Sequence, residues 1–541
     1  MSDAGRGHIF GVPGGLRFVK ETAICSATVH NVGNAVTGTE VTSTRYFGSE
    51  RWFLLMFAFA LLVVCACALT SWKYPRGTDQ YWYIADAESL AHGIHTTNNV
   101  YPANVTGPLP ASFIHNNVAI YAAVPLASVL GGQRGWIATN LICTIGSALI
   151  VFLLLRSRSV RVAALIATLF LLLPLTVWLT CNTLTEAVYA FFASLCLVVW
   201  LRAKTLLGTL FFVLSALIAA SAKEPLMLLF LVPVLPSLFG MWQKGPALRW
   251  TNIALSVFGF AAYSIFRPII FPENIHYTLA ARLITGATAA KDSMAPFFMN
   301  STPVFQWTIL WEKVGRNLRD LLRFRTEEMP FIVPLYLLVV LFLWQLGRNR
   351  KQLWVDCKES RAGLFTIVLV SSYFITAVLV LNAIRYSQYV IAPLLISTSL
   401  FVKWTERKLQ VIGFCIACLL PIALVLVLRI RKDSRQEFTE TKMIAQFVNS
   451  HLESGDPLLV LRVPAGQYLQ TGYAVRPRPA LMIEEENFCE VVNLYRSRYN
   501  VRYVFGPSSF LMGRGKLIGD LDRSAGYFAD YGLYDIQTTC R

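Results

Sequence analysis

Two carboxylates and one guanidinium stand at the borders of long apolar segments. Asp79 follows the first such segment, in TDQYWYIADAESLAHG (residues 78–93), and Glu186 precedes a later one, in TCNTLTEAVY. Arg385 precedes another, in NAIRYSQYVIAP. A carboxylate can take a proton from a hydroxyl group, and a guanidinium can hold a phosphate through charge-assisted hydrogen bonds. These residue types therefore predict acid–base chemistry beside a bound phosphate.

Residues 78–93 are expected to form a short helix at a membrane surface. The first residue is a threonine, which can cap a helix, and the last is a glycine, which can end one. The positive end of the helix dipole favours an ionised Asp79. Tyr81 and Trp82 suit the headgroup level of a bilayer, where they would line the site.

Further candidates stand at similar borders. Lys223 in SAKEP is a second candidate for holding a phosphate, Tyr386 is a candidate for lining a headgroup, and His115 can contact a phosphate or simply cap a helix. Each position also has an ordinary interpretation as a helix-end group, a solvated turn or an interfacial anchor. Charged groups at the ends of membrane spans are usually functional, and their common depth with Asp79 favours a site.

The composition requires a membrane protein. Of the 541 residues, 55% are hydrophobic and only 15% are charged. The net charge of +17 comes largely from short segments between apolar runs, where Lys and Arg set orientation, so no nucleic-acid partner is expected. About eleven runs are long enough to cross a bilayer: 52–69, 136–155, 160–180, 183–201, 205–221, 225–242, 252–270, 330–346, 362–381, 387–403 and 411–429.

The basic groups between these runs predict how the chain is threaded. Basic residues between spans are expected on the cytoplasmic side. Here they all lie on the same side as the N-terminus only if residues 118–130 do not cross the membrane, so this stretch is expected to lie flat at the interface. The predicted fold is a polytopic α-helical membrane protein in a bacterial inner membrane, with the N-terminus cytoplasmic. It has three parts: a flexible cytosolic tail (1–51), a transmembrane domain (52–430) with outer segments 70–135 and 271–329, and a small extracytoplasmic α/β domain (431–541).

The outer segments carry their own predicted elements. Residues 303–325 are expected to form a helix on the outer leaflet, with Leu318, Leu321 and Leu322 on one apolar face and arginines around it. Cys489 and Cys540 can pair if the tail is extracytoplasmic. The tail predicts helices at 437–452 and 487–498 and strands at 457–463, 480–483 and 501–505. It shows no phosphate loop or nucleophile elbow, so it is expected to serve recognition or support.

The chemistry that these residues support is sugar transfer from a polyprenyl-phosphate donor, because nucleotide sugars are cytosolic. Asp79 would take the proton of the acceptor hydroxyl, while Arg385 and Lys223 would hold the phosphate. Glu186 would orient the acceptor or hold a divalent cation. No metal-like cysteine spacing is present, and a divalent cation remains only a possibility. The acceptor can be a glycan, a lipid or a protein.

The order of these features resembles the GT-C glycosyltransferase superfamily, in the branch of protein O-mannosyltransferases and the lipid A aminoarabinose transferase. The resemblance extends from Trp52 to about Lys403, and Gln80 stands where relatives often have a second acid. It implies that Asp79 is the catalytic base, Glu186 a second acidic site residue and Arg385 a donor-phosphate contact.

Two other classes compete with this interpretation. A flippase or transporter is expected to carry charges near the bilayer midplane and an inverted repeat, and neither is visible in the sequence. An O-antigen ligase or polymerase would depend on Arg and His in a large outer segment, but residues 271–329 contain several arginines and only one histidine, His276. A scaffold without activity would tolerate loss of Asp79, Glu186 and Arg385 alike.

Overall fold

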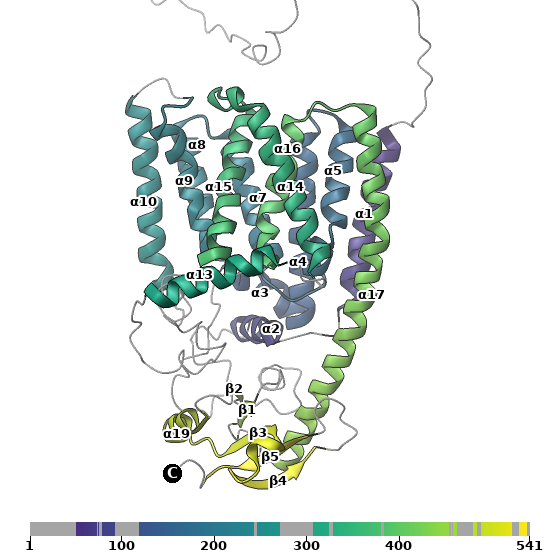
Figure 1. Ribbon diagram of the computed structural model, residues 1–541, viewed down its shortest axis with the longest axis vertical. Coiled ribbons are helices and arrows are strands. Elements are labelled where there is room, and N and C mark those ends of the chain that lie inside the picture. Colours follow the sequence, from purple (N-terminus) through teal and green to yellow (C-terminus); the bar gives the residue numbers. More distant parts are fainter. Residues whose placement is uncertain are drawn as a thin grey trace, which may run out of the picture. The chain divides into compact units, whose positions relative to one another are not determined.

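The computed structural model is mostly helical, with one sheet near the C-terminus (Figure 1). The predicted tail 1–51 lies outside the described residues, apart from its last two. The structure describes residues 50–72, 74, 78–91, 118–242, 246–270, 307–323, 328–379, 384–453, 456, 458–461, 480–483, 488–521 and 530–537.

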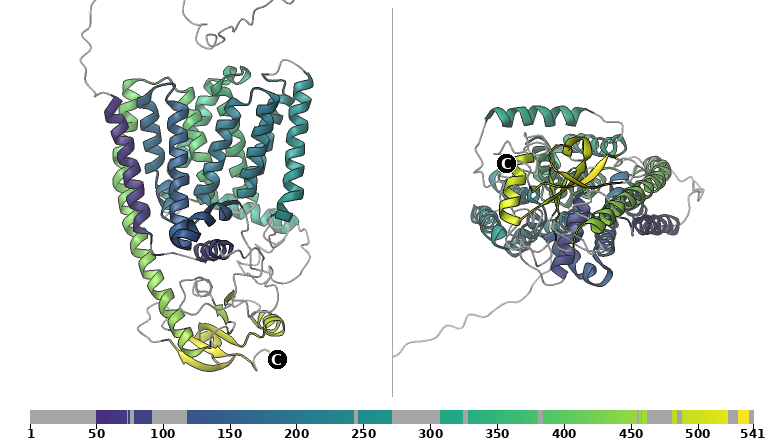
Figure 2. Two further views of the ribbon diagram at one scale, coloured as in Figure 1. Left: turned by 180° about the vertical axis from the view of Figure 1, so that it is seen from behind. Right: turned by 90° about the horizontal axis from the view of Figure 1, so that it is seen from below.

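The long helices stand side by side in one bundle (Figures 1 and 2). Within the described ranges, five are long and apolar enough to cross a membrane, and the bent pair α5 (Val160–Leu172) and α6 (Pro174–Thr180) makes a sixth if it forms one span. Pro174 explains the bend of 61°, because the residue before a proline is driven out of the helical region. The chain is thus a multi-pass membrane protein. The five are α1 (Glu50–Thr70), α4 (Gly132–Leu155), α14 (Met329–Arg348), α15 (Lys358–Leu379) and α17 (Glu406–His451).

The remaining predicted spans coincide with other helices. α7 and α8 have 17 residues each and α16 has 14, which is fewer than the roughly 20 residues that a straight membrane crossing needs. The predicted number of eleven membrane spans therefore stays a prediction. These helices are α7 (Glu186–Arg202), α8 (Leu206–Ala222), η1 (Glu224–Phe230) with α9 (Leu231–Leu238), α10 (Pro246–Ile270), and α16 (Gln388–Phe401), which follows η5 (Ile384–Ser387).

Three further helices lie together at one end of the bundle (Figure 1): α2 (Thr78–Ala91), α3 (Val118–Leu130) and α13 (Trp307–Leu322). With 13 residues, α3 is shorter than a crossing needs, in agreement with the prediction for this stretch. It packs closely on α4, since a Cβ on Gly135 would lie 2.4 Å from the Cα of Ala127. The single apolar face predicted for 303–325 is wrong, because Leu321 is buried while Leu318 and Leu322 are exposed.

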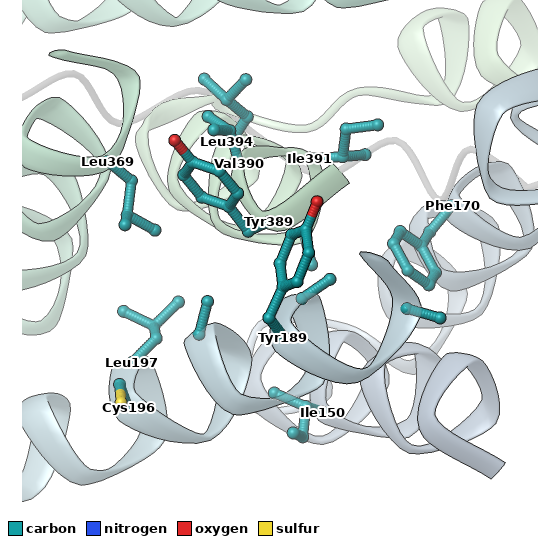
Figure 3. Close-up of a cluster of buried hydrophobic side chains, with 14 of the residues drawn as sticks. Ile150, Phe170, Tyr189, Cys196, Leu197, Leu369, Tyr389, Val390, Ile391 and Leu394 are labelled. Carbon is teal, nitrogen blue, oxygen red and sulfur yellow. The ribbon is translucent and has the colours of Figure 1, made fainter. Parts of the chain in front are cut away.

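The bundle core fixes α7 against α16. Tyr189 of α7 and Tyr389 of α16 pack edge to face at 5.9 Å between ring centroids, and both are buried among aliphatic side chains such as Leu394 and Ile150 (Figure 3). Helices that are apolar all round are expected in such a core. This packing sets the relative positions of the first residues of α7 and α16.

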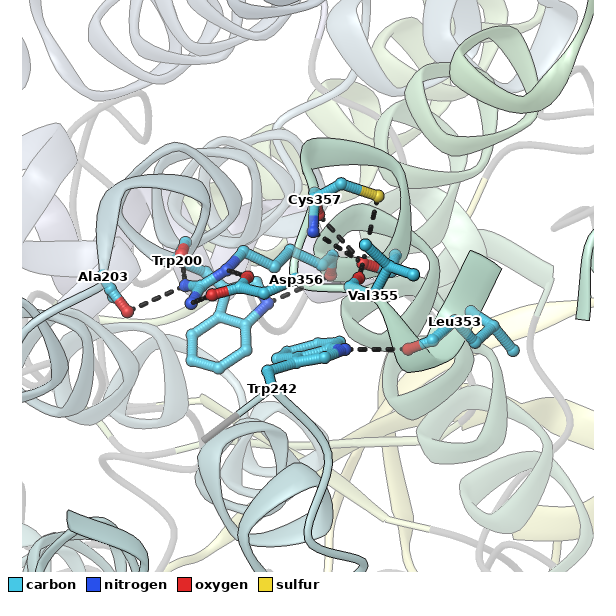
Figure 4. Close-up of polar contacts among 9 residues, drawn as sticks. Trp200, Ala203, Trp242, Leu353, Val355, Asp356 and Cys357 are labelled. Carbon is cyan, nitrogen blue, oxygen red and sulfur yellow. Dashed lines mark hydrogen bonds and ion pairs between the residues drawn. The ribbon is translucent and has the colours of Figure 1, made fainter. Parts of the chain in front are cut away.

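Arg361, near the start of α15, joins several helices at the end of the bundle opposite to α2 and α13 (Figures 1 and 4). Arg361 of α15 donates to Asp356 (Nε–Oδ1 2.5 Å) and to the carbonyl of Ala203 (Nη1–O 2.8 Å). Its guanidinium also lies 5.1 Å and 5.4 Å from the rings of Trp200 and Trp242. The guanidinium is therefore fully engaged and joins the end of α7 to the connection between α14 and α15, which contains η4 (Arg350–Trp354).

The C-terminal part contains a five-stranded sheet in the order β2-β1-β3-β5-β4. β1 pairs in parallel with β2 and β3, and β5 pairs in antiparallel with β3 and β4. The predicted tail helices and the three predicted strands are present, whereas β4 and β5 were missed; a separate domain from 431 stays a prediction. The elements are β1 (Leu458–Leu461), β2 (Ala480–Ile483), α19 (Phe488–Tyr499), β3 (Tyr503–Pro507), α20 (Ser508–Leu511), β4 (Lys516–Asp520) and β5 (Tyr531–Asp535).

Candidate active site

An ion pair joins the first residue of α7 to η5. The Nε of Arg385 lies 3.2 Å from Oε1 of Glu186, whose side chain is only 1% exposed. The other carboxylate oxygen, Oε2, is buried and accepts no hydrogen bond within the described structure. A buried carboxylate with one unused oxygen can receive a donor from a ligand, because leaving it unpaired is costly.

Lys223 lies beside this pair and has no carboxylate partner among the described side chains. Its Nζ lies 4.4 Å from the centroid of the Tyr386 ring and 5.9 Å from that of Tyr189. Arg385 lies over the same Tyr386 ring, at 5.2 Å. Two cations therefore lie against one aromatic ring near the start of α7, which is a suitable place for an anion.

The neighbouring carboxylate is already engaged elsewhere. Glu224 follows Lys223 directly, and its Oε1 lies 3.3 Å from Nη1 of Arg267 in the last turn of α10. Glu186 and Glu224 thus each have their own arginine in the part of the chain that the structure describes. Among the described residues, Lys223 has no ion pair that would neutralise it.

Gln80 holds the start of α2 against the residues that lead into α7. Its Nε2 donates to Oδ1 of Asn182 (2.9 Å), and its Oε1 accepts from the hydroxyl of Thr183 (2.8 Å). Asn182 is held in turn, because Asn140 of α4 donates to its carbonyl (2.7 Å). The backbone of Asp79, one residue before Gln80, is therefore fixed beside the segment that precedes Glu186.

The middle of α2 is fastened to α4. Trp136 donates from Nε1 to the carbonyl of Tyr83 (2.7 Å), and the amide of Gly132 donates to Oε1 of Glu88 (3.3 Å). A Cβ on Gly132 would lie 2.7 Å from Cγ2 of the buried Ile84, so this close approach favours glycine. On the same helix Asp86 is 3% exposed, and burial raises the pKa of its carboxyl well above its usual range.

No protein-family model and no curated protein matches the sequence. Solved structures do resemble it. ArnT from Cupriavidus metallidurans bound to undecaprenyl phosphate is 11% identical over 91% of this chain and 99% of that chain, with a TM-score of 0.56. The oligosaccharyltransferase of Archaeoglobus fulgidus in the apo form is 12% identical over 86% of this chain and 71% of that chain, with a TM-score of 0.51.

This chain has the GT-C glycosyltransferase fold. Within it, four of the predicted site residues come together: Glu186, Arg385, Lys223 and Tyr386. Asp79, Tyr81 and Trp82 lie on α2 as predicted, but their side chains are outside the described residues, as is the whole of His115.

Two features of this candidate site were not predicted from the sequence. Gln80 was noted only for standing where relatives have an acid, and its role as a bridge to Asn182 depends on a contact between distant segments. Asp86 was not considered. The only signal for it was its place in the same short helix as Asp79.

The described side chains do not fit a divalent cation. The part of the chain that the structure describes contains no cluster of three His, Cys, Asp or Glu residues suited to a metal. Around Glu186 they provide one carboxylate and two cations, whereas hard divalent ions prefer several oxygen ligands. We therefore assign no step to a metal.

Proposed function

We propose that this GT-C chain is an integral-membrane glycosyltransferase that moves a hexosyl or pentosyl group from a polyprenyl-phosphate donor to an acceptor hydroxyl. The fold supports this, because solved structures that share it hold lipid phosphates. One is the ArnT structure with undecaprenyl phosphate. Another is the archaeal oligosaccharyltransferase AglB in complex with an inhibitory peptide and a dolichol-phosphate, 11% identical over 85% of this chain and 69% of that chain, with a TM-score of 0.50.

The observation that carries the proposal is that the described side chains near the start of α7 carry one more positive charge than negative charge: Arg385, Arg267 and Lys223 against Glu186 and Glu224. Glu186 and Glu224 each pair with an arginine, whereas Lys223 contacts only aromatic rings among the described side chains. A phosphate on a lipid would supply the missing negative charge, and its tail would lie among the exposed apolar side chains of the spans.

In the proposed reaction, the acceptor oxygen forms a bond to the anomeric carbon of the sugar. The bond between that carbon and the phosphate oxygen breaks, and polyprenyl phosphate leaves with the electron pair. Asp79 takes the proton of the acceptor hydroxyl. Lys223 and Arg385 neutralise the leaving phosphate, and Glu186 holds the Arg385 guanidinium in place.

The site is proposed to face away from the cytosol in a bacterial inner membrane, with the N-terminus inside. Two observations support this side. The basic groups between spans favour it by the positive-inside rule. Cys489 of α19 is disulfide-bonded, whereas the other described cysteines are free, as expected if only the C-terminal part meets an oxidising compartment.

The test is turnover by the purified full chain with a panel of polyprenyl-phosphate sugars and an added acceptor extract. Asp79→Asn is expected to lower the rate by at least about 100-fold with the best donor, since it removes the base. Asp433→Asn, a matched change at a surface pair on α17, should leave the rate within about twofold of the native rate. Equal turnover by native chain and Asp79→Asn, or no turnover with any donor, would refute the proposal.

A further inference from the structure

Helix α13 has three distinct faces. Lys313, Asn317 and Leu321 recur every four residues and are buried at 3%, 4% and 7% exposure. Asn317 donates to the carbonyl of Val378 (2.9 Å), and the Leu321 carbonyl accepts from the hydroxyl of Tyr336 (3.1 Å). This packing face fixes how α13 is rotated against α14 and α15.

The second face is apolar and exposed. Trp307, Trp311, Leu318 and Leu322 follow at intervals of four, seven and four residues, which return to one side of a helix of 3.6 residues per turn. Their exposures are 64%, 65%, 47% and 71%. An exposed apolar stripe of this size requires a partner, and in a membrane protein the acyl chains of the bilayer supply it.

The third face is basic. Arg316, Arg319 and Arg323 are all exposed and lie on the side away from the packing face, next to the apolar stripe. Glu312 is exposed and Asp320 is partly exposed on the same helix, so the three arginines stand against two carboxylates among the described residues of α13. We call Arg316, Arg319 and Arg323 the arginine face.

The position of α13 in the fold agrees with this arrangement of a packing face, an apolar face and a basic face. It runs crosswise to the spanning helices at the end of the bundle and along its outer edge (Figures 1 and 2). In a bilayer that surrounds the spans, a helix at this level would place its apolar stripe at the acyl boundary and its arginine face among the headgroups, where basic residues attract anionic lipid.

We propose that α13 is a binding site for anionic phospholipids of the surrounding bilayer, with the arginine face holding their phosphodiester groups and the Trp307–Leu322 stripe their acyl chains. The site is separate from the proposed donor site at Lys223. In this proposal, the fraction of anionic lipid in the membrane affects how firmly α13 is held at the edge of the bundle.

The experiment is native mass spectrometry of the full chain, titrated with dioleoylphosphatidylglycerol or dioleoylphosphatidylcholine. The variant R316Q/R319Q/R323Q is expected to raise the apparent Kd for phosphatidylglycerol at least about tenfold and to leave phosphatidylcholine binding unchanged. R316K/R319K/R323K keeps the charge and should keep most of the preference. A control, R435Q/K442Q/K516Q, removes three exposed charges outside the predicted spans and should change the Kd less than about twofold.

Lys223→Gln separates the two possible phosphate sites. It should leave phosphatidylglycerol binding unchanged, because the phospholipid does not occupy the donor site. The proposal is overturned if Lys223→Gln abolishes the preference, if the control weakens binding as much as the arginine-face variant, or if the arginine-face variant binds phosphatidylglycerol normally.

Discussion

Glu186 and Arg385, which lie far apart in the sequence, form an ion pair of 3.2 Å in which the carboxylate is almost fully buried. The pair couples α7 to the short helix η5 at the mouth of the proposed site. Because the carboxylate is buried, removing either partner of the pair should be costly. A partner left alone in such a place loses its counter-charge without gaining full hydration.

Glu186→Gln should therefore destabilise the chain by about 2 kcal/mol, less than a fully buried pair would lose because Arg385 is 24% exposed. The double variant Glu186→Gln/Arg385→Gln should recover part of this, giving a coupling energy of about 1–3 kcal/mol in thermal unfolding. Glu406→Gln breaks a pair of similar length to Arg161 (3.3 Å) whose carboxylate is 67% exposed, and should cost less than about 1 kcal/mol. Equal losses for the two single variants would contradict a buried, coupled pair.

Lys223→Met should weaken binding of polyprenyl phosphate by roughly 10- to 100-fold, because one charge-assisted contact to the phosphate is lost. The measurement is competition by the lipid phosphate in the transfer assay or by direct titration. Lys408→Met removes an equivalent charge near the opposite ends of the spans and should leave the affinity unchanged. Unaltered affinity in Lys223→Met would remove Lys223 from the phosphate site.

Gln80→Met should lower kcat about tenfold and stability by about 1–3 kcal/mol, because the buried Thr183 backbone N–H and the Asn182 side-chain oxygen lose a partner. Gln80 acts here as a positioning residue for Asp79, so KM for the donor should change little. Ser215→Ala, which removes an exposed helix hydroxyl, is the control. A rise in KM with kcat unchanged would show that Gln80 serves binding instead.

Asp86 should make stability depend on pH in the direction opposite to a salt-bridged acid. The folded chain keeps a proton there that the unfolded chain releases above about pH 4, so stability is full below that pH and falls as pH rises through the raised pKa. Asp86→Asn should flatten this fall and unfold at a higher temperature than the native chain at pH 8. Asp433→Asn should keep the native profile, and a native slope in Asp86→Asn would show that another group titrates.

The membrane class, the short helix that contains Asp79 and the grouping of Glu186, Lys223 and Arg385 at one end of the bundle could all be predicted from the sequence. The lengths of the apolar segments and the positions of the charged residues are local properties of the sequence, and they indicate these features directly. The pairings themselves could not be predicted. That Glu186 meets Arg385 while Glu224 meets Arg267 depends on the side-by-side order of α7, α10 and α16, which no local pattern encodes.

The same limit explains the errors. A helix has room for two separate apolar faces, so periodicity alone did not distinguish the buried Leu321 from the exposed Leu318 and Leu322. β4 was missed because it is largely exposed and its sequence KLIGD lacks a strong alternating pattern. β5 is buried, but its sequence YGLYD contains a glycine and an aspartate, which are depleted in strands. The side chain of Asp79 and all of His115 lie outside the described residues, so their assigned roles stay predictions.

Helix α17 continues without interruption for 46 residues, from Glu406 to His451, and β1 begins a few residues beyond it. A continuous helix transmits rotation as well as distance. Removing one residue after the membrane span would turn everything that follows by about 100° and draw it in by about 1.5 Å. The number of helical residues between the membrane span and the end of α17 therefore determines the direction in which the chain leaves this helix toward β1.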